Sequence, residues 1–175
     1  GGETVRPLTP PADADPAQQV QREWLVTNGI GGYASGTVSG LVSRRYHGWL
    51  VAALPNPLGR TVMLTHLSEQ LRLADGRRVE LRAEETEARL ELHGDPYLTE
   101  FSLVDGLPRW RYDIDGTVLE KRVVLPHQRN MVHVTYRLVA GEGVVLLQLR
   151  PSMHFRHYEA AVNAGQPIEG EAAEP

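Results

Sequence analysis

The sequence predicts an all-β fold, an antiparallel β-sandwich, and three observations support this class. Apolar and polar side chains alternate along several short stretches, which is the pattern of strands that bury one face. Asp-Gly pairs lie between these stretches and supply the positive φ angles that tight hairpins need. The turn signals recur about every 8–12 residues, a spacing typical of an antiparallel sandwich or barrel.

The individual elements can be placed from these patterns. Residues 109–115, 131–138 and 144–149 carry an apolar side chain at every second position, so we expect a strand in each. Arg82–Leu92 has helical propensity, but its neighbours on both sides are strand-like, and we expect a pair of strands there. Tight turns are expected at Asp75-Gly76, Asp105-Gly106, Asp115-Gly116 and Gly141-Glu142-Gly143.

The chain divides into one domain and two flanking segments. Residues 1–19 are rich in proline and poor in apolar side chains, which predicts a flexible lead-in. Residues 161–175 are rich in glycine and glutamate and predict a tail or a linker. The β-sandwich domain is expected over residues 20–160.

The composition excludes several classes of protein. The chain has 175 residues, of which 41% are apolar, enough for one domain with a substantial core. It contains no cysteine, which excludes disulfides, thiolate zinc sites and cysteine nucleophiles. A net charge of −4 argues against a nucleic-acid partner. The sequence shows neither a signal peptide nor a membrane span, so we expect a cytoplasmic protein without a membrane partner.

The sequence contains no convincing catalytic, nucleotide-binding or metal-binding motif. Residues 28–34 contain G-x-G-x-x-A, but poor helix formers follow and no acidic ribose ligand stands downstream, so we reject a dinucleotide site. The sequence has no P-loop, no nucleophile elbow and no H-E-x-x-H motif, and it predicts neither a cofactor nor a metal. Glycoside hydrolysis needs two facing carboxylates. The spacing picks out no such pair, so no catalytic residue is named.

One segment, residues 23–53, has an unusual composition. It combines glycines, two arginines, a histidine and aromatic rings, a poor composition for plain core strands. A glycine-rich bend lets the backbone approach another group closely. Arginine makes directional hydrogen bonds, and Trp and Tyr offer flat apolar faces with a polar edge. Sugars present the same mixture of apolar ring faces and hydroxyl groups.

The order of residues in this segment carries a resemblance. It reads Glu23-Trp24-Leu25-Val26-Thr27-Asn28-Gly29-Ile30-Gly31-Gly32-Tyr33, followed by Arg44-Arg45-Tyr46-His47-Gly48. This run resembles the opening motif of the bacterial and archaeal type of glycogen-debranching enzyme (amylo-α-1,6-glucosidase). Weaker matches follow in the same order, so the resemblance covers about residues 22–158; they include Pro108-Arg109-Trp110-Arg111-Tyr112, Asn130-Met131-Val132 and Leu149-Arg150-Pro151.

The resemblance implies a two-domain enzyme, in which an N-terminal super-sandwich-like domain precedes a C-terminal (α/α)6 barrel that carries the glucosidase carboxylates. Such enzymes hydrolyse α-1,6-linked glucose at glycogen branch points, and some relatives also transfer short α-1,4 chains. This chain stops before any barrel and is shorter than the family's N-terminal domain, so we expect a truncated sandwich. It departs from the family at residues 155–159, Phe-Arg-His-Tyr-Glu, where an Arg-Asp-Tyr-His-like run is expected, and the role of the family's histidine is not carried over.

Two interpretations of the motif stay open. In the first, the glycine turn shapes the fold, and Arg44 or Arg45 pairs with Glu23 or docks the barrel. In the second, Trp24, Arg45, Tyr46 and His47 touch glucan or line the rim of the active site. We favour the structural or interface interpretation, because Arg and aromatic residues also dominate domain interfaces. The predicted substrate-binding or interface residues are Trp24, Asn28, Gly29, Gly31, Gly32, Tyr33, Arg44, Arg45, Tyr46 and His47.

The sequence therefore predicts a non-catalytic N-terminal domain that supports a catalytic barrel and positions branched α-glucan such as glycogen. A free-standing carbohydrate-binding or interaction module is the alternative, and an independent small hydrolase is a third hypothesis. Because a truncated sandwich leaves sheet edges open, we also expect self-association.

Overall fold

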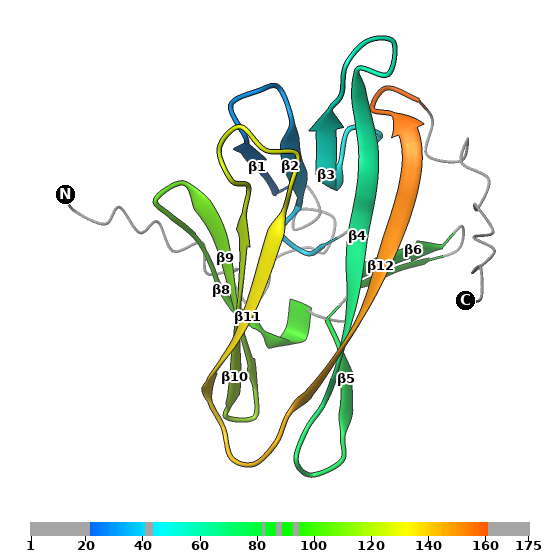
Figure 1. The fold of residues 1–175 in the computed structure, drawn as a ribbon. Helices are drawn as coiled ribbons and strands as arrows, with labels where there is room; N and C mark the ends of the chain where they lie inside the picture. Colours follow the sequence, from blue (N-terminus) through cyan, green and yellow to red (C-terminus); the bar gives the residue numbers. More distant parts are fainter. Residues whose placement is uncertain (1–21, 41–43, 82, 87–88, 93–94, 161–175) are drawn as a thin grey trace, which may run out of the picture.

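The computed structural model describes residues 22–40, 44–81, 83–86, 89–92 and 95–160, and these form two antiparallel sheets that face each other (Figure 1). No α-helix occurs in these ranges, and the single helical element is a 3-10 turn at Asp95–Tyr97. The predicted all-β sandwich is confirmed. The predicted lead-in, residues 1–19, and the predicted tail, residues 161–175, lie outside the described residues.

The larger sheet has six strands in the order β1-β2-β3-β4-β12, with β5 beside β4. β4 is 13 residues long. Its first half therefore pairs with β3 and its last residues with β5, while β12 runs along its other edge. The strands are β1 (Glu23–Thr27), β2 (Tyr33–Thr37), β3 (Gly48–Ala53), β4 (Arg60–Arg72), β5 (Arg78–Glu80) and β12 (Leu146–His157).

The smaller sheet is a four-stranded meander in the order β11-β10-β9-β8. Its two hairpin turns are the predicted Asp-Gly pairs, since Asp105-Gly106 and Asp115-Gly116 all have positive φ. The strands are β8 (Leu98–Val104), β9 (Leu107–Ile114), β10 (Thr117–Val124) and β11 (His133–Ala140).

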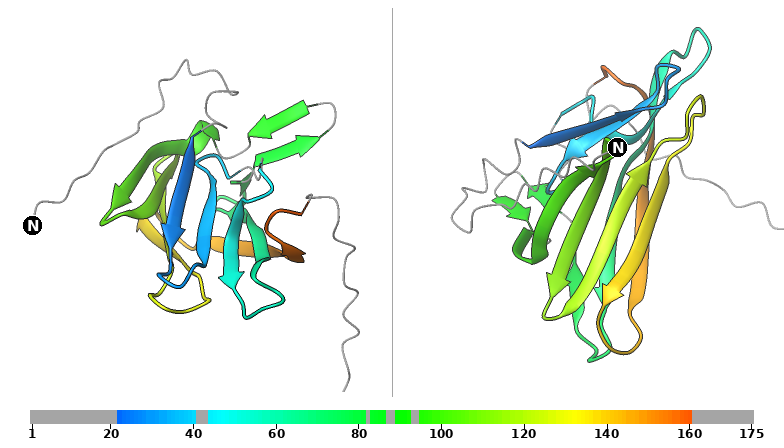
Figure 2. Two further views of the ribbon diagram at one scale, coloured as in Figure 1. Left: turned by 90° about the horizontal axis from the view of Figure 1, so that it is seen from above. Right: turned by 90° about the vertical axis from the view of Figure 1, so that its left-hand side faces the viewer.

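A separate two-stranded hairpin, β6 (Ala83–Thr86) and β7 (Arg89–Leu92), lies apart from both sheets. The strand pair predicted for Arg82–Leu92 is thus confirmed (Figure 2). The segment forms a hairpin despite its helical propensity. Four consecutive residue pairs join the two strands in antiparallel register, from Ala83 with Leu92 to Thr86 with Arg89.

Three tryptophans form the centre of the core between the sheets. Trp24 meets Trp110 and Trp49 edge to face, at ring-centroid distances of 5.4 and 5.7 Å, and Trp49 stacks on Trp110 at 6.1 Å. The indole N–H of Trp110 donates to the carbonyl of Val38 at 2.8 Å, and that of Trp24 to the carbonyl of Thr37 at 3.1 Å. The polar edges of Trp24 and Trp110 are thus satisfied by backbone carbonyls.

Lys121, the single lysine, is buried beside these rings. Its Nζ lies 4.8 Å from the ring centroids of both Trp49 and Trp110, and it donates to Glu69 Oε1 at 2.8 Å. Tyr136 donates its hydroxyl to the same oxygen at 2.5 Å. Burial, reinforced by the charge of Glu69, raises the pKa of Tyr136 far above its usual value. Because Glu69 comes from β4 and the two donors from β10 and β11, this group joins the two sheets.

Both sheets end at open strands on one side of the molecule. In the part of the chain that the structure describes, β12 pairs with β4 alone and β11 with β10 alone. These two strands follow each other in sequence, and both lie at the front of the molecule as seen in Figure 1, β11 in the smaller sheet and β12 in the larger. Along them several large apolar side chains stay exposed, including Leu138, Leu149 and Met153. Across the described ranges, no helix is long and apolar enough to cross a membrane.

Candidate functional site

The turn between β1 and β2 is built around Asn28, whose side chain is fully buried. Its Oδ1 accepts hydrogen bonds from the backbone N–H groups of Ile30 at 3.1 Å and Gly32 at 2.9 Å. Gly29 and Gly31 have φ angles of 82° and 97°, in the left-handed region that favours glycine. One side-chain amide and two glycines thus fix the shape of the turn.

The same amide fastens the turn to the loop after β10. Asn28 Nδ2 donates to the carbonyl of Arg129 at 2.9 Å, and the N–H of Gln128 donates to the carbonyl of Asn28 at 2.6 Å. Asn130 adds a second attachment, because its Oδ1 accepts from the N–H of Ala53 at 2.9 Å and its Nδ2 donates to the carbonyl of Ala53 at 2.8 Å. The motif is therefore anchored on both sheets.

Close packing explains two of the motif's glycines. A Cβ on Gly29 would lie 2.4 Å from the ring of His127. A Cβ on Gly32 would lie 2.4 Å from Asn28 Nδ2 and 3.0 Å from the carbonyl oxygen of Val51. Both positions need glycine for the fold itself, whatever the motif binds.

A polar cluster forms where β1 meets the turn before β3. The carboxylate of Glu23 accepts a hydrogen bond from the hydroxyl of Tyr46 at 3.2 Å, and Arg44 Nε lies 3.6 Å from it. Of the two arginines expected to pair with Glu23, Arg44 does so. The carbonyl of Tyr46 accepts from the hydroxyls of Tyr33 at 2.9 Å and Ser35 at 3.2 Å, which ties the cluster to β2.

His47 lies at the buried side of this cluster and is fully enclosed. Its Nδ1 accepts the backbone N–H of Arg44 at 3.1 Å, so the neutral ring carries its proton on Nε2, which lies 3.3 Å from Glu23 Oε1. Burial lowers the pKa of His47 below its usual value, and the attraction of Glu23 opposes this without overcoming it. The imidazole is consequently neutral at pH 7.

The outer side of β1 and β2 bears an open groove of about 610 Å³. Its lining includes the rings of Tyr33 and Tyr46, the side chain of Leu25, the guanidinium of Arg60 and the glycine turn. Leu25 is 61% exposed and Tyr46 is 40% exposed. A mainly apolar concave surface with a few directional polar groups is typical of small-molecule sites.

The predicted site residues divide between this groove and its supports. Six line the groove, namely Trp24, Gly29, Gly31, Gly32, Tyr33 and Tyr46. Asn28 and Arg44 contact the groove residues from outside it. Arg45 is exposed but is not a lining residue.

Two of the residues considered as glucan contacts are buried. The side chain of Trp24 belongs to the core and is 5% exposed, and His47 is fully buried. A ring enclosed to this degree offers no face to a sugar. Trp24 nevertheless belongs to the groove lining, and His47 contacts the lining residue Glu23.

Two arginines that the motif does not contain complete the site. Arg60 donates Nε to the carbonyl of Gly31 at 2.8 Å and lies over the ring of Tyr158 at 5.7 Å. Arg156, 6% exposed, donates Nη2 to the carbonyl of Arg45 at 2.8 Å and Nη1 to that of Ala160 at 3.1 Å. Burial lowers the pKa of Arg156 from its usual value. Sequence spacing gave no signal for either contact, because the partners are 29 and 111 residues apart.

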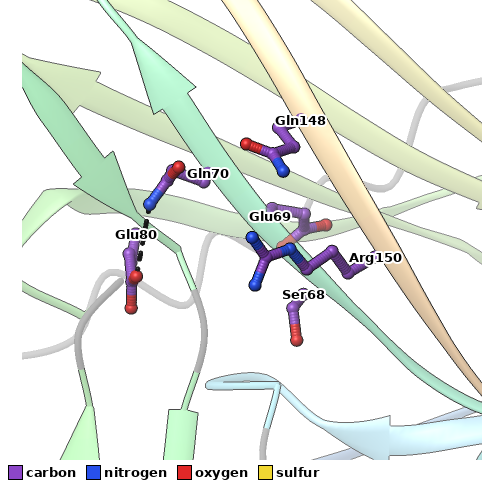
Figure 3. Close-up of a pocket in the computed structure, with 6 residues that line it drawn as sticks. All are labelled: Ser68, Glu69, Gln70, Glu80, Gln148 and Arg150. Atoms are coloured by element: carbon purple, nitrogen blue, oxygen red, sulfur yellow. Dashed lines mark hydrogen bonds between the residues drawn. The ribbon is translucent and has the colours of Figure 1, made fainter.

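A second, smaller hollow lies on the outer face of the larger sheet. Figure 3 shows its six lining side chains along β4, β5 and β12: Ser68, Glu69, Gln70, Glu80, Gln148 and Arg150. Gln70 Nε2 donates to Glu80 Oε1 at 3.3 Å. The volume is about 50 Å³, room for a few water molecules, and Glu69 is held by Lys121. The hollow is too small for a glucosyl unit, so its two carboxylates do not form a glycosidase pair.

Metal binding finds no support in the described part of the chain, where no three histidine, aspartate or glutamate side chains could hold an ion together. The chemistry available in the groove is that of ring faces, one carboxylate and one guanidinium.

Comparison with known proteins gives one match. A family model described as "Glycogen debranching enzyme N terminal" matches residues 22–174, which include every strand of both sheets and all the residues of the groove. No curated protein and no solved structure matches the chain.

Proposed function

This chain belongs to the family of glycogen debranching enzyme N-terminal domains, and we propose that it acts as a non-catalytic domain that supports a catalytic barrel and positions branched α-glucan in the groove of β1 and β2. The observation that carries the proposal is the groove itself. It has a volume of about 610 Å³, and it presents Tyr33, Tyr46 and Leu25 beside Arg60.

The groove has the chemistry that an α-glucan needs. The face of a glucosyl ring is apolar and packs on an aromatic or aliphatic side chain, here Tyr46 or Leu25. Its hydroxyls need directional donors and acceptors, which Arg60 and Glu23 provide. Both tyrosine hydroxyls are already bonded within the protein, Tyr33 to a carbonyl and Tyr46 to Glu23, so the rings are fixed before a ligand arrives. A prearranged surface loses less entropy on binding.

The groove supports binding rather than hydrolysis. Among the described residues that line it, Glu23 is the one carboxylate, and it is shared by Tyr46, Arg44 and His47. Cleavage of a glycosidic bond needs two carboxyl groups on opposite sides of the bond. We therefore place the hydrolytic chemistry of the parent enzyme in its catalytic domain.

A second candidate function, docking of the catalytic barrel on the same surface, is favoured by a different observation. Two large apolar side chains are well exposed here: Leu25, which lines the groove, at 61%, and Ile30, between the lining glycines Gly29 and Gly31, at 44%. Apolar groups gathered around a concave surface also mark domain interfaces. The two functions are compatible if the groove lies at the rim between the domains.

Titration calorimetry on this chain with a linear maltooligosaccharide and with an α-1,6-branched one tests the glucan proposal. We expect Tyr46→Ala and Arg60→Ala to weaken binding by about tenfold each, which corresponds to about 1.4 kcal/mol. Arg45→Ala is the matched control, because Arg45 is exposed and adjacent in sequence but lies outside the groove lining.

The outcomes separate the two functions. If no oligosaccharide binds at millimolar concentration, or if Arg45→Ala weakens binding as much as Tyr46→Ala does, the groove is not a glucan site. Retained glucan binding with lost affinity for the separately expressed barrel in a Leu25→Asp variant would assign the apolar rim to docking.

A further inference from the structure

The open side of the sandwich is incompletely covered. In an antiparallel pair, directly opposite residues point to the same face. Leu138 lies opposite the buried Leu119, and Leu149 lies opposite the buried Glu69, so both point inward between the sheets. They nevertheless remain 42% and 41% exposed. Inward side chains with this exposure mean that the core lacks a side wall along β11 and β12.

The two edge strands differ in how they are protected. β12 contains Pro151, which has no N–H to offer, and its register with β4 shifts on both sides of Met153. Proline and bulges are the usual means of blocking an edge against pairing. β11 has no proline, its one register shift with β10 leaves out Val139 near its end, and its 8 residues carry a single formal charge, Arg137. β11 is therefore the less protected of the two edges, and its residues up to Leu138 pair without interruption.

We propose that β11 pairs antiparallel with β11 of a second copy of this chain, in the register that places Tyr136 opposite Tyr136 of the partner subunit. The inward side chains of both copies must lie on the same face of the joined sheet. Under a two-fold axis this requires a register in which one residue lies directly opposite the same residue of the other copy. Centring on Arg137 would set two guanidinium groups opposite each other, which is unfavourable. Centring on Tyr136 sets Val134 against Leu138 of the partner subunit and Thr135 against Arg137 of the partner subunit, and these pairs all lie in the regularly paired part of the strand.

The same symmetry would close the open side of both layers. A two-fold axis perpendicular to the smaller sheet keeps each copy's larger sheet on the same side. The edge of β12 then faces its own counterpart, because β11 and β12 lie on one side of the molecule (Figures 1 and 2). Leu149 and Met153, 41% and 61% exposed, would meet apolar groups there instead of water. The result is a continuous double layer rather than two sandwiches with open ends.

The proposal is tested by sedimentation equilibrium of the full chain across micromolar concentrations, with charge variants at Thr135. We expect the mass to rise with concentration from 19.4 kDa to twice that value. Thr135 is exposed, so replacement does not disturb the core. By symmetry the proposed register contains two pairs of residue 135 with Arg137 of the partner subunit. Thr135→Glu adds two opposite-charge pairs and should lower the dissociation constant about fivefold, whereas Thr135→Lys adds two like-charge pairs and should raise it by a similar factor.

Two controls keep the test specific. Leu25→Lys removes a comparably exposed apolar side chain from the groove and should leave the dissociation constant unchanged. Leu138→Lys puts a charge at the inward edge of β11 and should abolish association. A monomer at every concentration would overturn the proposal. Association that responds equally to Thr135→Glu and Thr135→Lys, or that responds to Leu25→Lys, would overturn the β11 register.

Discussion

Replacing Lys121 by methionine gives the sharpest test of how the two sheets are joined. Methionine keeps nearly the volume of lysine between Trp49 and Trp110 but removes the charge that faces Glu69 at 2.8 Å. With an effective dielectric constant of about 20, the attraction lost is about 6 kcal/mol. The several kcal/mol needed to desolvate the two ions offset much of that gain, so the intact pair contributes little net stability.

The variant loses stability because it leaves the buried carboxylate of Glu69 without its ion-pair partner. Its side chain is 2% exposed, and among the described residues the hydroxyl of Tyr136 is the hydrogen-bond donor that remains to it. An isolated buried carboxylate escapes by taking up a proton, and protonating an ordinary glutamate at pH 7 costs about 3.7 kcal/mol. We therefore expect Lys121→Met to lower the free energy of unfolding by about 3–4 kcal/mol at pH 7. Because that cost changes by about 1.4 kcal/mol per pH unit, the loss should shrink to about 1 kcal/mol at pH 5.

Urea denaturation followed by tryptophan fluorescence at both pH values measures this difference. The double variant with Glu69→Gln is the control, since a neutral amide has no proton to take up and its loss should not vary with pH. The reasoning fails if Lys121→Met loses less than about 1 kcal/mol at pH 7, or if its loss is the same at pH 5.

Three further predictions concern the motif. The pKa of His47 is lower in the folded chain than in the unfolded one, so its contribution is complete above about pH 6.5 and is lost as the pH falls; His47→Gln should flatten the stability profile between pH 7 and pH 5 in urea titrations. Gly29→Ala should cost more stability than Gly106→Ala by about 1 kcal/mol or more, because both have positive φ but only the first would meet His127, and equal losses would contradict this. Asn28→Ala should lower stability by about 2–4 kcal/mol and broaden the amide signals of the turn in NMR spectra, and a native-like spectrum would speak against its central role.

Strand identity was predictable because it depends on local pattern. Trp110, Tyr112 and Ile114 stand at alternate positions, and all three are buried on one face of β9. Asp105-Gly106 and Asp115-Gly116 predicted hairpins through their own backbone preferences. These features require no knowledge of distant residues.

The site was predictable only in part, because its geometry depends on distant contacts. The motif identified Tyr33, Tyr46 and the glycine turn correctly as neighbours. It could not show that the ring of Trp24 turns into the core to meet Trp49 and Trp110. Lys121 is the single lysine in the sequence, but nothing in the sequence indicates that it pairs with Glu69, 52 residues away.

The burial of Lys121 also has a consequence for chemical labelling. Amine-directed reagents such as acylating dyes and most cross-linkers react with exposed, unprotonated ε-amino groups, and the only ε-amino group of this sequence is sealed between two indole rings and a carboxylate. In the native chain its acylation should proceed only as fast as the sheets separate. The rate at which that one side chain becomes modified therefore reports the opening of the sandwich at a single position, without any engineered probe.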